Sequence, residues 1–94
     1  MYLYLGQGAV VPQTAVVAVC DMDNTTSSPA TRAFLSRAER EGRLRAVFDD
    51  LPKSFVICRE PGEEQTTVYL SQLSPATLLR RAEGSWLDSL ASDN

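Results

Sequence analysis

Histidine is absent from this sequence of 94 residues, and its absence excludes several kinds of catalytic site. Without an imidazole the chain has no Ser-His-Asp or Cys-His machinery and no side chain that ordinarily exchanges protons near neutral pH. A zinc site is not expected either, because the soft ligands that remain are two thiols in separate apolar segments. We therefore predict a protein that is not an enzyme and that uses no cofactor or metal.

Cysteine is scarce as well, since Cys20 and Cys58 are the only two. Two cysteines are too few for a disulfide scaffold, and both lie inside apolar runs, where a free thiol behaves as a small buried hydrophobic group. We interpret them as free core residues. A redox or disulfide role is the alternative.

Long apolar runs are also missing. No segment approaches the roughly 18 residues of a membrane span, and the start MYLYLGQG lacks the basic region of a signal peptide. There is no glycine-rich phosphate loop, because the single GQG is not followed by a helix. These absences predict a cytoplasmic protein without a membrane partner.

The charge is unevenly distributed over the chain, although the net charge is only −3. Between residues 32 and 45, five arginines stand against two glutamates and give a local charge of +3. We predict one domain over residues 1–83 and a disordered tail over residues 84–94, where serine and aspartate are frequent. Trp86 lies in that tail as part of a weak amphipathic cluster.

Alternating and apolar segments predict an α+β fold with a small, mainly antiparallel sheet. Residues 1–5 alternate leucine with tyrosine, residues 9–11 form a short second strand, and residues 14–20 are apolar on both faces, as in a central strand. Residues 43–48 predict a further strand. Residues 54–59 and 66–70 predict a hairpin across the turn at Pro61-Gly62.

Two Ser-Pro pairs predict the helices, because serine is a good N-cap and proline suits the first helical turn. The central helix begins after Ser28 and ends at Gly42. Its inward stripe is expected to hold Ala30, Ala33, Phe34 and Ala38. The short C-terminal helix begins after Ser74, with Ala76, Leu79 and Ala82 inward and Arg80 and Arg81 outward.

The segment VAVCDMDNTT offers an enzymatic alternative, because an apolar strand ending in DxDxT resembles the first motif of haloacid-dehalogenase-type phosphatases. In that chemistry Asp21 would attack a phosphoryl group, and Asp23 would serve as acid and base beside magnesium. The later lysine and the late carboxylate pair are missing from this chain. The other interpretation is a polar turn in which Asp21 and Asp23 bond backbone N–H groups.

Four blocks in order resemble the RemB-like branch of the bacterial RemA/RemB family of extracellular-matrix (biofilm) regulators. They are YLYLGQGAVVP, DMDNTTSSPATRAFL, DDLPKSFV and VYLSQLSPATLLRR, and together they cover about residues 1 to 82. The resemblance implies a small transcriptional regulator with a LytTR-like fold. It also implies assembly into a ring, with double-stranded DNA contacted by arginines repeated from each subunit, and it places Arg32 where the RemA branch carries a basic residue.

Two functions remain open at this point. The first is a homo-oligomeric, DNA-binding regulator, and the second is an oligomeric protein-interaction regulator that does not bind DNA directly. In the second case the arginines form a solvated helix face paired with Glu39 and Glu41. The expected nucleic-acid-binding residues are Arg32, Arg37, Arg40, Arg43, Arg45 and Lys53.

Overall fold

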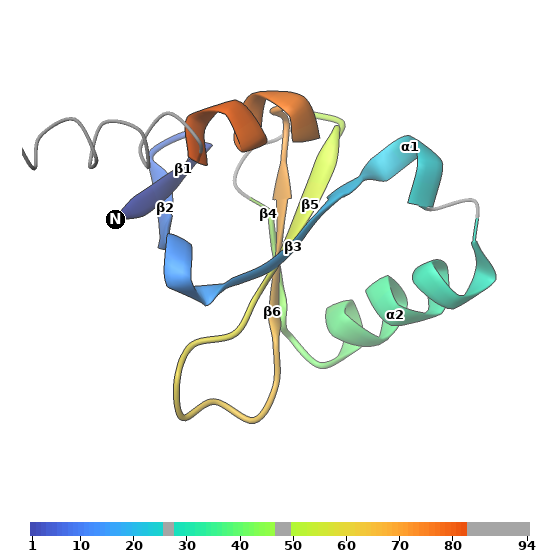
Figure 1. Ribbon diagram of the computed structural model, residues 1–94. Helices are drawn as coiled ribbons and strands as arrows, with labels where there is room; N and C mark the ends of the chain where they lie inside the picture. The colour runs from blue at the N-terminus through green and yellow to red at the C-terminus, as the bar shows by residue number, and fades with distance from the viewer. Residues whose placement is uncertain (26–27, 47–49, 83–94) are drawn as a thin grey trace, which may run out of the picture.

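The computed structural model describes residues 1–25, 28–46 and 50–82 and has the predicted α+β architecture (Figure 1). The tail predicted at residues 84–94 lies outside the described residues. The elements are β1 (Tyr2–Gly6), β2 (Ala9–Pro12), the 3-10 helix η1 (Gln13–Ala15), β3 (Val16–Asp21), α1 (Met22–Thr25), α2 (Pro29–Arg40), β4 (Leu44–Ala46), β5 (Ser54–Cys58) and β6 (Thr67–Ser71). A further helix covers residues 75–82 and is called the C-terminal helix below.

Strands β1 and β2 form an antiparallel hairpin of their own. The alternation in the sequence is confirmed, because Leu3 and Leu5 are buried whereas Tyr2 and Tyr4 are exposed. The reversal between the strands runs through Gly6, Gln7 and Gly8, all with positive φ, a conformation that costs glycine least.

The larger sheet has four strands in the order β3-β5-β6-β4. The predicted hairpin of β5 and β6 is confirmed, and β4 joins β6 in parallel. The prediction of a central strand at residues 14–20 is wrong, since β3 lies at an edge. Val16 and Val19 pack on one face of the sheet and Cys20 packs on the other, but Val17 is 62% exposed, so the apolar sequence is only partly explained by burial.

Strand β5 separates two apolar clusters because its side chains alternate between the faces of the sheet. Val56 and Cys58 pack with Leu3, Leu5 and Leu78 under the hairpin and the C-terminal helix. Phe55 packs with Ala38 and Val68 under α2. The molecule therefore has three layers: the hairpin with the C-terminal helix, the sheet, and α2 (Figure 1).

Helix α2 begins at Pro29 and ends near Gly42, as predicted, although the side chain of Ser28 makes no capping bond. At the other end, Gly42 has a φ of 73°, its N–H donates to the Glu39 carbonyl, and the Arg43 N–H donates to the Ala38 carbonyl. This pair of bonds is the Schellman arrangement. It directs the chain straight from the helix into β4.

The inward stripe of α2 differs from the prediction at two positions. Ala38 is buried and Phe34 is half-buried, but Ala30 and Ala33 are exposed. Leu35 takes part instead, packing with Phe34 against the cluster around Phe55. Phe34 and Leu35 pack in the cluster around Phe55, whereas Ala33 is exposed and Ala30 borders an open pocket between α2 and the sheet.

The C-terminal helix begins as expected, because the Ser74 hydroxyl accepts a hydrogen bond from the Thr77 N–H at 3.2 Å. The prediction that Leu79 faces inward is wrong: Leu78 is fully buried and Leu79 is 58% exposed. Ala76 is also exposed, and Ala82 is half-buried. One large residue, Leu78, therefore anchors the helix over the hairpin.

Buried hydroxyl groups join the layers. Ser71, at the end of β6, donates to the Leu5 carbonyl at 2.7 Å and accepts from the Leu73 N–H at 3.0 Å. Ser54 donates to the Leu73 carbonyl at 2.8 Å. These bonds fix the end of β1 and the entry to the C-terminal helix against the sheet.

Candidate nucleic-acid interface

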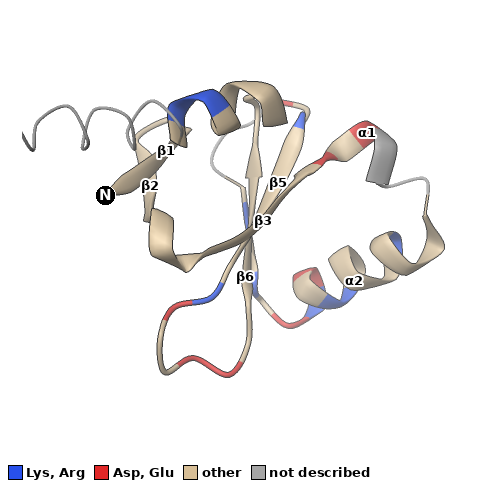
Figure 2. Ribbon diagram, in the orientation of Figure 1, with Lys and Arg blue, Asp and Glu red and all other residues tan. Residues whose placement is uncertain are grey.

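Three of the six predicted basic residues lie on α2, whose ribbon is coloured as basic toward both of its ends (Figure 2). Arg32, Arg37 and Arg40 are all exposed on this helix. Eight residues separate Arg32 from Arg40, which places them roughly 12 Å apart along the helix axis. The outer side of α2 therefore presents guanidinium groups over most of its length.

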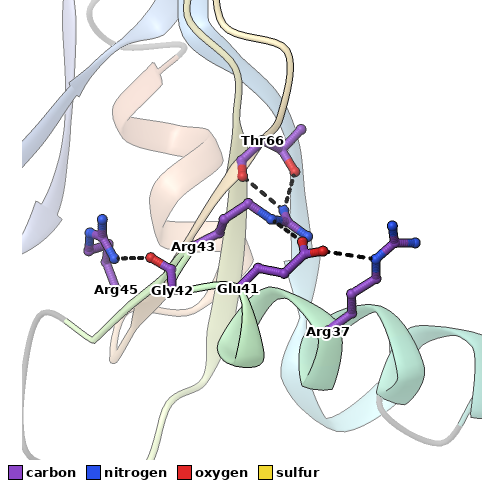
Figure 3. A network of polar contacts seen from close by, with 6 residues as sticks. All are labelled: Arg37, Glu41, Gly42, Arg43, Arg45 and Thr66. Carbon is purple, nitrogen blue, oxygen red and sulfur yellow. Dashed lines mark hydrogen bonds and ion pairs between the residues drawn. The ribbon is translucent and has the colours of Figure 1, made fainter.

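At the C-terminal end of α2, two predicted residues meet on one carboxylate in a polar network (Figure 3). The Arg43 Nε donates to the Glu41 carboxylate at 2.8 Å, and the Arg37 Nε donates to the other oxygen of the same carboxylate at 3.3 Å. Hydrogen bonds from Arg43 and then Arg37 lower the pKa of Glu41. The pairing of basic residues with Glu41, expected for a solvated helix face, is confirmed for these two arginines.

Arg43 is bound to the protein on more than one side. Its side chain is only 14% exposed, and its Nη1 donates to the carbonyl oxygen and to the hydroxyl of Thr66 at 2.9 and 3.0 Å. Since β4 begins at the next residue, these bonds attach the end of α2 to the start of β6. Arg43 is therefore held as a structural residue, with little of its guanidinium open to a phosphate.

Arg43 and Arg45 are two positions apart in the sequence, but their side chains point apart (Figure 3). Arg45 turns back and donates to the Gly42 carbonyl at 2.6 Å, next to the helix end. The residue is exposed. Arg45 lies opposite Tyr69, which packs on the other face of the sheet from α2, so Arg45 does not extend the basic surface of that helix.

Lys53 lies away from the other predicted residues. It precedes β5, and β5 runs antiparallel to β6 while β4 runs parallel to β6, so the start of β5 and the start of β4 lie at opposite ends of the sheet. The Lys53 backbone pairs with Ser71 and Met22. The structure gathers Arg32, Arg37 and Arg40 on one helix and leaves Arg45 and Lys53 apart.

Acidic residues limit the basic surface on one side. The loop between β5 and β6 carries Glu60, Glu63 and Glu64, all exposed (Figure 2). Glu63 and Glu64 line a shallow pocket together with Arg43. Positive potential is therefore expected along the outer side of α2 and is reduced where Arg43 meets this loop.

A second basic position was not nominated from the sequence. The Arg81 guanidinium lies over the Tyr4 ring at 5.1 Å from its centroid, so the C-terminal helix and β1 share an exposed cation–π pair. Arg81 was predicted to face outward, but its contact joins it to a residue 77 positions earlier in the chain. Local patterns carry no signal for such a contact.

The segment that resembles a phosphatase motif contains the bond that a polar turn predicts. The Asp23 N–H donates to the Asp21 Oδ1 at 2.8 Å, two residues back, directly after β3. Within residues 1–25, 28–46 and 50–82, no group of three or more histidine, cysteine, aspartate or glutamate side chains is placed to hold a metal ion.

Both cysteines are free, and they belong to opposite faces of the sheet. Burial raises the pKa of the Cys58 thiol to about 11, with a further contribution from the charge of Glu60. Burial also raises the pKa of Cys20. A higher pKa leaves less reactive thiolate, which agrees with the interpretation of both residues as apolar side chains.

Comparison of the sequence with protein-family models found no match, and comparison with curated proteins found none either. The resemblance to the RemA/RemB family thus rests on the four sequence blocks. In the part of the chain that the structure describes, no helix is long and apolar enough to cross a membrane.

Proposed function

We propose that this chain is a cytoplasmic, non-enzymatic, homo-oligomeric DNA-binding regulator of extracellular-matrix and biofilm genes. The observation that carries the proposal is the row of exposed guanidinium groups on α2, from Arg32 through Arg37 to Arg40. The resemblance of four ordered sequence blocks to the RemB-like branch supplies the class of target. The phosphates of double-stranded DNA are a binding partner for such a row of guanidinium groups.

A few cationic side chains per subunit are enough for DNA binding when the same subunit is repeated around a ring. Each guanidinium that neutralises a phosphate releases counterions, and a ring that presents the same helix many times along one duplex multiplies that effect. Few base edges are within reach of so few arginines. Sequence preference is therefore expected to come largely from the bending and groove width of the DNA.

The proposal is tested by DNA binding across a salt series, with two matched single-charge losses. Arg40→Ala removes an exposed cation from the outer side of α2. Arg59→Ala removes one at the end of β5, where its Nε is bonded to the Glu63 carbonyl. We expect Arg40→Ala to weaken binding uniformly across sequences and to lower the salt slope by about 1 for each subunit in contact. Arg59→Ala should bind like wild type.

An alternative is an oligomeric protein-interaction regulator that does not bind DNA directly. The acidic loop of Glu60, Glu63 and Glu64 and the ion pairs at Glu41 favour this alternative, because they reduce the free positive charge. Absence of any DNA shift at about 50 mM salt, where electrostatic binding is strong, would rule out direct recognition and leave the alternative.

A further inference from the structure

The hairpin of β1 and β2 leaves an apolar surface on its outer side. Seven large apolar side chains are exposed among the residues that the structure describes, and three of them belong to this hairpin. They are Tyr2, Tyr4 and Val10, which are 65%, 42% and 55% exposed. Tyr4 pairs with Val10 across the strands, and Tyr2 lies on the same side of β1 as Tyr4. We call the surface defined by these three residues the hairpin face.

The hairpin face is uncharged and is bordered by a cation. Neither β1 nor β2 contains a charged residue. The Arg81 guanidinium lies over the Tyr4 ring, and the Tyr4 hydroxyl accepts a hydrogen bond from the Gly8 N–H at 3.3 Å, so this ring lies along its own hairpin. Tyr4 is therefore covered on one side, and Tyr2 and Val10 are the more exposed part of the face.

The described chain leads into the tail beside this surface. Its last residue, Ala82, packs on the apolar cluster under the hairpin, and the residue before it is Arg81, over the Tyr4 ring. The open apolar pocket of about 270 Å³ between α2 and the strands β3 and β5 lies on the opposite face of the sheet (Figure 1). The tail, residues 84–94, thus starts next to the hairpin face and away from that pocket.

The tail is long enough to cover the hairpin face. Tyr2 is two positions from Tyr4 along β1, which separates the two residues by roughly 7 Å. The chain from Arg81 to Trp86 spans roughly 8 Å as a helix and roughly 17 Å when fully extended. In either conformation Trp86 can reach Tyr2 from a chain that leaves the domain above Tyr4.

The composition of the tail suits an uncharged apolar surface with a cation at its edge. Its large apolar residues are Trp86, Leu87 and Leu90, and its charged residues are Asp88 and Asp93, with no basic residue among them. The hairpin face does not repel such a segment, and the cation at its border attracts it. Because the tail belongs to the same chain, its effective concentration at the face is on the order of millimolar, and a weak contact is enough.

We propose that the tail folds back over the hairpin face of its own chain, with the ring of Trp86 packed on Tyr2 and Val10. A tryptophan ring buries about 150–250 Å² in such a contact. The contact orders a segment whose composition alone predicts disorder, and it closes the hairpin face to other apolar partners until the tail is displaced. It involves neither the basic residues of α2 nor DNA.

The test uses the fluorescence of Trp86, which is the only tryptophan of the chain. In the folded wild type we expect emission at shorter wavelength and weaker quenching by acrylamide than in the chain unfolded in urea. Tyr2→Glu should shift the emission toward that of the unfolded chain, because it removes a ring beneath the indole and repels Asp88. Val10→Ser, on the other strand, repeats the test with a smaller change.

Two variants outside the hairpin face are the controls. Val17→Glu alters an apolar side chain of β3 that is 62% exposed, much like Tyr2 at 65%. Ala30→Glu places a carboxylate at the pocket beside α2. Both should keep the wild-type emission, and circular dichroism should show that every variant is folded. A shift caused by Ala30→Glu and not by Tyr2→Glu would place the tail in the pocket and overturn the proposal.

A mixing experiment separates a contact within one chain from a contact between two copies. Tyr2→Glu is mixed with an excess of Trp86→Ser, which has an intact hairpin face and no tryptophan. Unchanged emission of the mixture supports the contact within one chain, whereas a return to the wild-type emission means that the tail docks on a second copy. Wild-type emission equal to that of the unfolded chain overturns the proposal outright. Since no DNA is present, these failures leave the proposed regulatory function standing.

Discussion

Among the residues nominated from the sequence, Arg43 differs most from its expected role. A guanidinium has five donors in a rigid fork, and at Arg43 three of its contacts are made to Glu41 and Thr66. From the sequence alone, an arginine-rich segment is interpreted as a binding surface. The distinction between a binding and a structural arginine depends on a partner 23 residues away, which the local sequence does not indicate.

Arg43→Ala should therefore act on stability. The substitution leaves the Thr66 carbonyl without its charged donor and removes a largely buried stem, so we expect the free energy of unfolding to fall by about 1.5–3 kcal/mol. The pair with partly exposed Glu41 adds little to that loss. Urea denaturation measures the change, and Arg40→Ala, at an exposed position, should stay within about 0.5 kcal/mol of wild type.

The carboxylate of Glu41 predicts a dependence of stability on pH. Because Arg43 and Arg37 lower its pKa in the folded state, its contribution is fully present above the ordinary glutamate pKa and is lost as pH falls through the lowered value. Thermal unfolding of wild type and Glu41→Gln should therefore differ near neutral pH and converge in acid. A constant difference down to the lowest pH would contradict this assignment.

At the scale of elements, local sequence patterns correctly predicted the first strand and the start of the central helix. Alternation in β1 and the Ser-Pro start of α2 are properties of a few adjacent residues, and both were predicted correctly. The order of the strands in the sheet was not predicted correctly. It depends on pairing between β4 and β6, 24 positions apart in register, and no periodicity within either strand encodes that partner.

The connection from α2 to β4 gives the element-scale prediction. Gly42 has a positive φ, and a Cβ there would meet no atom within 4 Å, so backbone strain alone opposes a side chain. We expect Gly42→Ala to lower the free energy of unfolding by about 1–2 kcal/mol. Gly42→Asn should lose less, because asparagine tolerates the left-handed region better. Equal losses in urea denaturation would mean that strain is not the cause.

At the scale of the whole molecule, β5 contributes side chains to both apolar clusters, one on each face of the sheet. Phe55 and Val56 are adjacent in the chain, yet they are buried on opposite faces. We expect Phe55→Ala to cost about 3–5 kcal/mol, a large part of the roughly 5–15 kcal/mol available to a domain of this kind. Circular dichroism should still show one transition. Two separate transitions would mean that the layers unfold independently.

Part of the candidate site could be predicted from the sequence, because part of it depends only on local patterns. The outward arginines of α2 follow from helical spacing, and the resemblance to a regulator family directs attention to them. Contacts between segments far apart in the sequence, such as Arg81 over Tyr4 or Arg43 on Thr66, arise only after the sheet is assembled. Their partners are set by topology, so a local pattern names one member of each pair at most.

The hydrogen bond of the Ser71 hydroxyl bears on when the chain can fold during its synthesis on the ribosome. It holds the Leu5 carbonyl, 66 residues earlier in the chain, and Leu78 closes the same cluster. The first strands to be synthesised therefore complete their packing only when nearly all of the described chain has emerged, although Val56 and Cys58 of β5 join the same cluster earlier. We expect folding to be slow for so small a domain, because these contacts join residues that are far apart in the sequence.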